Sequence, residues 1–199
     1  MTKSVITIGR EYGSGGREIG RKLAEKLNIP FYDKELLTVA AKKSGLSEEM
    51  FESHDEKPTN SLLYSLVMGN YGSDNLPLNH KLFLAQFDAI RSIADEGPCI
   101  IIGRCADYAL EDYENCINIF IHSDIKSRIE RAVEKYGVNA VKAEETLSKT
   151  DKKRASYYNF YSSKKWSSSS SYDLIVDSGK LGVDKTVDLI IEYIRLREN

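Results

Sequence analysis

This sequence of 199 residues contains few cysteines and histidines, carries a small net charge and has no long hydrophobic run. The three cysteines, Cys99, Cys105 and Cys116, show no C-x-x-C spacing. An odd number of unclustered cysteines is typical of reduced thiols rather than of a disulfide scaffold. No apolar run is long enough to span a membrane, and no apolar leader precedes the first predicted strand. We therefore expect a cytoplasmic protein that does not contact membranes.

The low net charge and the isolated histidines argue against two further classes of protein. A formal net charge of −2 argues against a protein that coats nucleic acid, because such proteins carry a basic surface. His54 and His80 have no metal-binding partner at helical spacing, so they do not predict a metal site. The length suits one domain covering residues 1–199, and 41% hydrophobic residues are enough for a core.

The most informative segment runs from Val5 to Arg17 and reads VITIGREYGSGGR. Its apolar, β-branched beginning predicts a buried strand, and its glycines predict a tight turn. Ile19, Leu23 and Leu27 then recur at helical spacing. Where a strand, a glycine loop and a helix follow one another, backbone N–H groups converge at the helix N-terminus and the helix dipole adds partial positive charge. The segment therefore predicts a binding site for a phosphate chain.

Two phosphate-binding motifs compete for this loop, and each is incomplete. A Rossmann fingerprint, G-x-G-x-x-G, begins at Gly13-Ser14-Gly15, but Glu18 replaces the third glycine. Asp33 lies at the distance expected for the ribose-binding acid of that fold. A P-loop, G-x-x-x-x-G-K-[ST], would have lysine and a hydroxyl residue where this chain has Gly16-Arg17. The residues alone leave both motifs open.

Five β-rich segments alternate with amphipathic helical segments along the chain. The predicted strands are residues 5–8, 30–33, 98–103, 117–121 and 172–177, and clear helices are predicted over 19–28, 35–43, 80–96 and 183–195. This alternation predicts an α/β fold with a parallel sheet and helices on both faces. Gly20 lies beside the apolar stripe of the first helix, where a missing side chain would let that helix approach the sheet closely.

The stretch Ile8–Gly20 resembles the cytidylate kinase-like family, a bacterial branch of the P-loop nucleoside-monophosphate kinases. Four later pieces resemble it too: Phe31–Asp33, Gly103–Asp107, Asp151–Arg154 and Tyr172–Asp177. The resemblance covers nearly the whole chain. It implies a P-loop NTPase fold with strand order 2-3-1-4-5, and an enzyme that transfers phosphate from ATP to a nucleoside monophosphate.

We expect the loop and several arginines to hold phosphate. The candidate phosphate-binding residues are Arg10, Gly13, Ser14, Gly15, Gly16 and Arg17. Arg17 or Arg10 would supply the charge that lysine gives in an ordinary P-loop. Arg104 follows the third predicted strand, where its guanidinium group could bind a substrate phosphate through forked hydrogen bonds. The resemblance implies that Arg128 reaches phosphate, with a solvated helix edge as the alternative, and that Arg154 closes over the transferred group. Arg17, Arg128 and Arg154 are thus the candidate catalytic residues.

Two acids complete the candidate substrate site. Asp33 ends the second predicted strand, where it either contacts a ligand or caps the next helix. Cytidylate kinases carry Asp-Gly-Arg-Asp after the third strand, and both acids are missing around Gly103-Arg104. Asp107 could replace them only if its helix turned it inward. Mg²⁺ therefore has no evident protein ligand and would be held mostly by phosphates and waters. Residues that could help indirectly are Glu11, Ser14, Glu18 and Asp107.

Two regions have weaker patterns. Residues 44–79 are polar and interrupted by glycine and proline, and the resemblance places the monophosphate-binding insertion there; a surface excursion or a dimer contact is the alternative. Residues 139–171 are rich in basic and aromatic side chains, and the resemblance makes them a lid. Such a mixture also fits single-stranded nucleic acid. Within this region Asp151 and Arg154 lie one helical turn apart and could pair.

Together these patterns predict a nucleotide kinase that uses ATP and Mg²⁺ and acts on small-molecule nucleotides, without nucleic-acid or membrane partners. A second hypothesis is a module that binds nucleotide or phosphate without turnover, because the P-loop lysine and both usual Mg²⁺ ligands are missing. A dinucleotide-binding protein is the third. The sequence leaves open the phosphate acceptor and whether the chain forms a homodimer.

Overall fold

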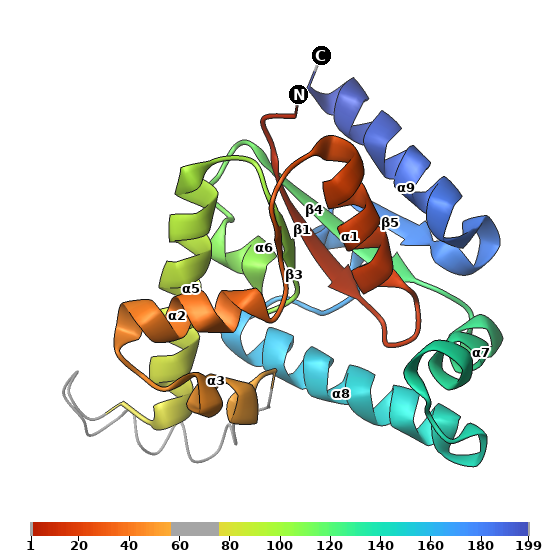
Figure 1. The fold of residues 1–199 in the computed structure, drawn as a ribbon, viewed down its shortest axis with the longest axis horizontal. Helices are drawn as coiled ribbons and strands as arrows, with labels where there is room; N and C mark the ends of the chain where they lie inside the picture. The colour runs from red at the N-terminus through yellow and green to blue at the C-terminus, as the bar shows by residue number, and fades with distance from the viewer. Residues whose placement is uncertain (1, 57–75, 199) are drawn as a thin grey trace.

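The computed structural model describes residues 2–56 and 76–198, and a five-stranded sheet forms its centre (Figure 1). The strands are β1 (Val5–Arg10), β2 (Phe31–Tyr32), β3 (Ile100–Ile102), β4 (Cys116–His122) and β5 (Leu174–Asp177). Neighbouring strands run parallel in the order β2-β3-β1-β4-β5. The predicted sheet and strand order are confirmed. A Rossmann fold places its second strand beside the first, so the dinucleotide-binding alternative is wrong.

Helices connect the strands and cover both faces of the sheet, as predicted. They are α1 (Gly16–Leu27), α2 (Glu35–Ser44), α3 (Glu48–His54), α5 (Leu78–Glu96), α6 (Ala106–Ala109), α7 (Ile125–Tyr136), α8 (Ala143–Ser162) and α9 (Ser178–Arg197). Helix α9 begins earlier than its pattern predicts and departs from helical geometry at Gly182, where φ is 73°. Part of the predicted insertion, residues 57–75, lies outside the described residues. Among the helices that are described, none is long and apolar enough to cross a membrane.

Each face of the sheet carries its own hydrophobic core. Ile6 and Ile8 pack with residues of α1 and α9, whereas Val5 packs with residues of α2 and α5 on the other face. Strand β3 repeats this pattern, with Ile100 on the α1 side and Ile101 on the α5 side. The two-residue period of a strand explains the alternation. Burial on both faces explains why these strands are apolar throughout.

Helix α1 lies close to the sheet because residue 20 is glycine. A Cβ on Gly20 would lie 2.7 Å from Ile102 Cδ1 and 3.2 Å from Ile8 Cδ1. A larger residue would therefore push the helix away from the strands. The predicted close approach of this helix to the sheet at Gly20 is confirmed. It places the glycine loop, which precedes the helix, near the ends of the strands.

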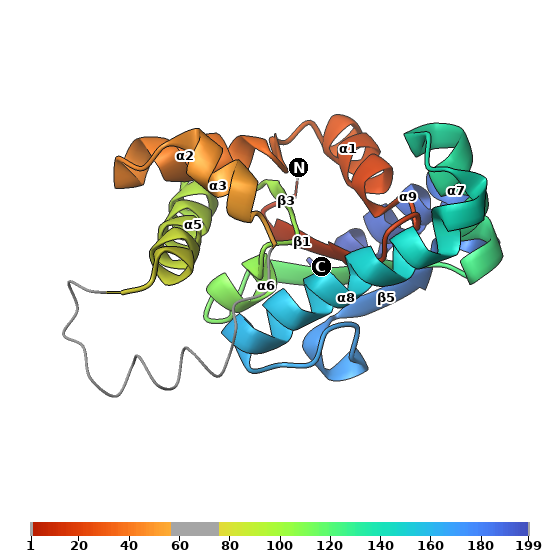
Figure 2. The same ribbon diagram turned by 90° about the horizontal axis from the view of Figure 1, so that it is seen from below.

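Helix α8 runs along the edge of the sheet that carries the glycine loop, and it crosses in front of the sheet in Figure 2. Its C-terminal half forms a third core cluster with α5, in which Tyr157, Tyr158 and Tyr161 are buried. The rings of Tyr161 and Phe83 stack with centroids 3.9 Å apart. Rings buried in a core cannot stack on bases, so these three tyrosines do not contribute to the nucleic-acid alternative.

Candidate functional site

The loop between β1 and α1 needs glycine at two positions. Gly13 and Gly15 have φ angles of 84° and 81°, in the left-handed region that residues with a Cβ rarely adopt. A Cβ on Gly13 would lie 2.6 Å from the carbonyl oxygen of Arg128, and a Cβ on Gly15 would lie 3.0 Å from Cζ of Arg131. Because α1 begins at Gly16, the N–H groups of its first turn have no intrahelical acceptor. The loop therefore has the backbone of an anion site.

Gly16 stands where a P-loop has lysine, and its missing side chain makes room for Arg10. A Cβ on Gly16 would lie 2.6 Å from Cβ and 3.3 Å from Cγ of Arg10. Arg10 ends β1, is largely buried, and passes over Gly103, where a Cβ would collide with its Nη1 atom. A guanidinium group thus enters the site from the end of β1.

A cleft of about 360 Å³ opens beside the loop. The predicted site residues that line it are Arg10, Gly13, Gly15, Gly16, Arg17, Asp33, Arg104 and Arg154. Three other predicted residues, Ser14, Asp107 and Arg128, are absent from this lining. Ser14 is buried, and its hydroxyl donates to the carbonyl oxygen of Glu11 at 2.8 Å. The fold thus brings side chains from the ends of β1, β2 and β3 and one side chain from α8 to the same cleft.

Asp33 connects two of the arginines in the cleft. Its carboxylate lies 2.6 Å from Arg17 Nε and 3.2 Å from Arg104 Nη1. Helix α2 has Lys34 at its N-cap and no side-chain cap, so the capping role considered for Asp33 is wrong. Arg104 is only 3% exposed, and it also makes a forked pair with Asp55 at 2.9 and 2.8 Å.

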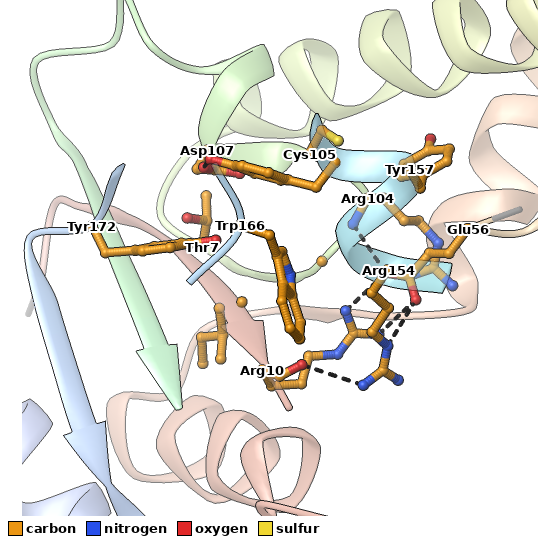
Figure 3. Close-up of a pocket in the computed structure, with 14 residues that line it drawn as sticks. Thr7, Arg10, Glu56, Arg104, Cys105, Asp107, Arg154, Tyr157, Trp166 and Tyr172 are labelled. Atoms are coloured by element: carbon orange, nitrogen blue, oxygen red, sulfur yellow. Dashed lines mark hydrogen bonds and ion pairs between the residues drawn. The ribbon is translucent and has the colours of Figure 1, made fainter. Parts of the chain in front are cut away.

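Glu56 lies among guanidinium groups at one end of an inner cavity that adjoins the cleft (Figure 3). Its carboxylate accepts hydrogen bonds from Arg10 at 2.8 and 3.3 Å and from Arg154 Nε at 3.1 Å. Burial alone would raise the pKa of Glu56, but attraction to Arg10 and then to Arg154 holds that pKa far below its usual range. The pKa of Arg154 is lowered by its burial and by the neighbouring charge of Arg10.

Arg128 binds the glycine loop itself. Its Nε atom donates to the carbonyl oxygen of Tyr12 at 2.8 Å, and its Nη1 atom lies 3.2 Å from the Glu11 carboxylate. It also pairs closely with Asp151, which accepts a hydrogen bond from the Tyr12 N–H at 2.7 Å. Asp151 and Arg154, predicted to pair, have their direct ion pairs elsewhere, Asp151 with Arg128 and Arg154 with Glu56. The charge of Asp151 still acts on Arg154, whose pKa it raises against the lowering by burial. A catalytic role for Arg128 stays a prediction.

Asp107 lies in the inner cavity, which has room for about one water molecule at about 20 Å³. Its carboxylate accepts a hydrogen bond from the Tyr158 hydroxyl at 2.6 Å, and burial raises the pKa of this acid. Figure 3 shows Asp107 and Tyr172 at the end of the cavity away from Glu56. Asp107 thus points inward, but toward tyrosines rather than the loop, and its part in substrate binding stays a prediction.

The acids nearest the loop are already paired with arginines. Glu11 pairs with Arg128 at 3.2 Å, and Glu18 pairs with Arg131 at 2.6 Å. Within residues 2–56 and 76–198, no three His, Cys, Asp or Glu side chains are grouped so that they could hold a metal ion. The glycine loop and its arginines fit a phosphate chain. The carboxylates of Glu11 and Glu18 do not fit as ligands of Mg²⁺, because both are paired with arginines.

Comparison with known proteins agrees with this geometry. Residues 5–180 match the model of the cytidylate kinase-like family. The chain belongs to this family. The matched region includes the glycine loop, the cleft and α8. No curated protein matches the chain significantly.

Several solved structures have a fold similar to that of this chain. A structure of an uncharacterized protein from Eubacterium ventriosum ATCC 27560 is 34% identical, with a TM-score of 0.74 over 97% of this chain and 99% of that one. Shikimate kinase from Bacteroides thetaiotaomicron is 15% identical, with a TM-score of 0.57 over 98% and 99%. Shikimate kinase from Acinetobacter baumannii, in complex with shikimate, is 13% identical, with a TM-score of 0.56 over 99% and 95%. At such low identity the shikimate kinases show the fold alone, which is that of a P-loop kinase.

Sequence reasoning missed the acidic partners of the cleft. Asp55 and Glu56 follow α3 in a polar stretch without periodicity, so no local signal identifies them. Their partners are distant along the chain: Arg10 is 46 residues from Glu56, and Arg104 is 49 residues from Asp55. Only the fold brings these charges together.

Proposed function

We propose that this chain is an ATP-dependent phosphotransferase that acts on a nucleoside monophosphate or a similar small phosphate acceptor. One observation carries the proposal: Gly16 leaves room for Arg10, and Arg17, Arg104 and Arg154 line the same cleft beside the glycine loop. Guanidinium groups bind phosphate through forked hydrogen bonds. Phosphoryl transfer depends mainly on positioning and charge stabilisation, so we assign no general base.

Each part of the cleft has a role in this proposal. The amides of residues 13–17 hold the phosphates of ATP, and Arg10 or Arg17 supplies the charge that lysine gives in an ordinary P-loop. Arg104 holds the acceptor, with Asp33 fixing its orientation, and Arg154 stabilises the transferred group. Residues 44–79 and 139–171 would serve as substrate-side insertion and lid. Since the nearby acids do not fit as Mg²⁺ ligands, no protein ligand is assigned to the metal.

The proposal is tested first by binding and then by turnover. A thermal-shift screen of nucleotides, with and without Mg²⁺, should identify ligands, because a ligand of the native state raises Tm. A panel of nucleoside monophosphates is then assayed for phosphoryl transfer. Arg154→Ala should lower kcat about 100-fold, the usual effect of removing one transition-state donor. Lys153→Ala, at an exposed neighbouring position on α8, is the matched control.

A second candidate is a module that binds nucleotide or phosphate without turnover. The sequence favours it, because Gly16-Arg17 replaces the lysine and the hydroxyl residue of an ordinary P-loop. The same experiments separate the two. If ATP binds and the wild-type chain phosphorylates no acceptor of the panel, the binding module is correct and the kinase is not. Cytoplasmic location and homodimer formation stay predictions.

A further inference from the structure

The arginines of the cleft are already neutralised by carboxylates of the chain itself. The four that line it, Arg10, Arg17, Arg104 and Arg154, pair with Asp33, Asp55 and Glu56. Three internal anions thus offset most of the charge that four guanidinium groups provide. A phosphate ligand attracted by these arginines has to compete with carboxylates that are built into the protein.

Glu56 has the contacts of a bound oxyanion. Its Oε1 atom accepts from Arg10 Nη1 at 2.8 Å and lies 3.4 Å from the backbone N–H of Arg104. Its Oε2 atom accepts from Arg154 Nε at 3.1 Å and from Arg10 Nη2 at 3.3 Å. Donors from β1, α8 and the turn after β3 therefore converge on one carboxylate, as donors converge on phosphoryl oxygens. Gly103 permits this meeting, since a Cβ there would lie 2.6 Å from Oε1 of Glu56.

The backbone on both sides of this contact is strained. Glu56 has a φ angle of 48°, and Arg104 and Cys105 have φ angles of 54° and 56°. None of them is glycine, and L-residues rarely adopt this left-handed conformation because Cβ crowds the backbone. Glu56 adopts this conformation while its carboxylate is paired with Arg10 and Arg154.

We propose that Arg10, Arg154 and the backbone amide of Arg104 form an oxyanion site, and that a phosphoryl group binds there by displacing the carboxylate of Glu56. The identity of the ligand as a nucleotide rests on the proposed function; the site itself does not. Glu56 acts as an internal competitor that keeps the arginines paired until phosphate arrives. It lowers the apparent affinity for phosphate, because the competent state requires its ion pairs to break first.

The test compares Glu56→Gln with the wild-type chain by calorimetric titration with pyrophosphate, ATP and CMP. Glutamine keeps the size of the side chain and removes the competing charge. We expect Glu56→Gln to bind pyrophosphate and at least one nucleotide about tenfold more tightly, equivalent to about 1.4 kcal/mol. A gain with ATP assigns the site to the donor phosphates, and a gain with CMP assigns it to the acceptor. Glu52→Gln, at an exposed position on α3, should match the wild type.

Removal of a buried partner can impair folding, so circular dichroism accompanies each titration. Glu56→Asp supplies a second variant, because it keeps the charge but retracts the carboxylate by one methylene. It should bind pyrophosphate with an affinity between those of the wild type and Glu56→Gln. If folded Glu56→Gln and Glu56→Asp bind pyrophosphate no more tightly than the wild type, the oxyanion site is wrong. If Glu56→Gln binds pyrophosphate more tightly but the wild type phosphorylates no acceptor, the kinase proposal is wrong and the oxyanion site is supported. If the wild type phosphorylates an acceptor but Glu56→Gln binds pyrophosphate with unchanged affinity, the kinase proposal is supported and the oxyanion site is wrong.

Discussion

A Cβ on Gly16 would lie 2.6 Å from the Cβ of Arg10, so the two positions share one space. The ordinary P-loop has lysine at the position of Gly16, and in this chain the stem of an arginine from the preceding strand lies against that position. The missing lysine at position 16 and the arginine at position 10 are therefore coupled. The charge near the loop is kept, but it is delivered from a different element.

This coupling predicts how substitutions at the two positions combine. Gly16→Lys alone should lower the free energy of unfolding by about 1–3 kcal/mol through overpacking and weaken ATP binding. Combining it with Arg10→Gly frees the space, so the double variant should be more stable than the sum of the single effects by about 0.5–3 kcal/mol. Urea denaturation and ATP titration measure both effects. Strict additivity would show that the two positions do not compete.

Arg128 should stabilise the glycine loop, in addition to the catalytic role predicted for it. It is buried, and its three groups of contacts fix the carbonyl oxygen of Tyr12, Glu11 and Asp151. Arg128→Ala should lower the free energy of unfolding by about 3–5 kcal/mol, because it leaves Asp151 without its buried partner. Asp151→Asn should cost nearly as much, and the double variant should cost far less than the sum.

The control for this pair lies on the same helix. Arg131 pairs with Glu18 at a more exposed place, with 22% and 39% of the two side chains accessible. Arg131→Ala should therefore destabilise the protein less than Arg128→Ala does. Chemical denaturation of the variants checks the order. Equal losses from both would indicate that the contacts of Arg128 with the loop have no special importance.

Asp33 should be important for stability as well as for the cleft. Asp33→Ala leaves Arg104, which is 3% exposed, with fewer compensating charges. Removing one partner of a buried ion pair costs about 3–5 kcal/mol, so the melting temperature should fall markedly. Asp112→Asn, which breaks the exposed pair with Arg91, should leave the melting temperature almost unchanged. Calorimetric melting of both variants gives the comparison.

Stability should decline in alkaline solution because of buried thiols. Burial raises the pKa of Cys99 and of Cys116 to about 12, from a usual value near 9. The unfolded chain loses these protons above about pH 9 while the folded chain keeps them. Stability is therefore full below pH 9 and falls as pH rises toward 12, with each thiol contributing on the order of 1 kcal/mol by pH 10.

Urea denaturation between pH 8 and pH 10 measures this decline. The variant with Cys99→Ala and Cys116→Ala should show a shallower dependence on pH, whatever its stability at pH 8. A thiol reagent at pH 8 should react with these cysteines only as the protein unfolds, because the folded chain keeps them buried and protonated. Identical pH slopes for the two proteins would mean that the thiols do not cause the decline.

The sequence determined the fold because its signals are local. Alternating apolar and amphipathic segments predict parallel strands and covering helices, and Gly20 marks the helix that lies closest to the sheet. The glycine loop is likewise recognisable, because its residues are neighbours in the chain. Placing Arg17, Asp33 and Arg104 at one edge also needs only the rule that parallel strands end together. Arg154 lies on α8, and only the family resemblance brought it to the site.

The partners of those charges were decided by the tertiary structure alone. Arg128 turned out to hold the loop, Asp107 faces tyrosines, and Asp151 pairs across two helices rather than with Arg154. Glu56 reaches the arginines from a stretch without periodicity. Periodicity reports which face of an element is buried, but an ion pair depends on the relative position of elements distant in sequence. That position is set by packing of the whole core, which no short stretch of sequence records.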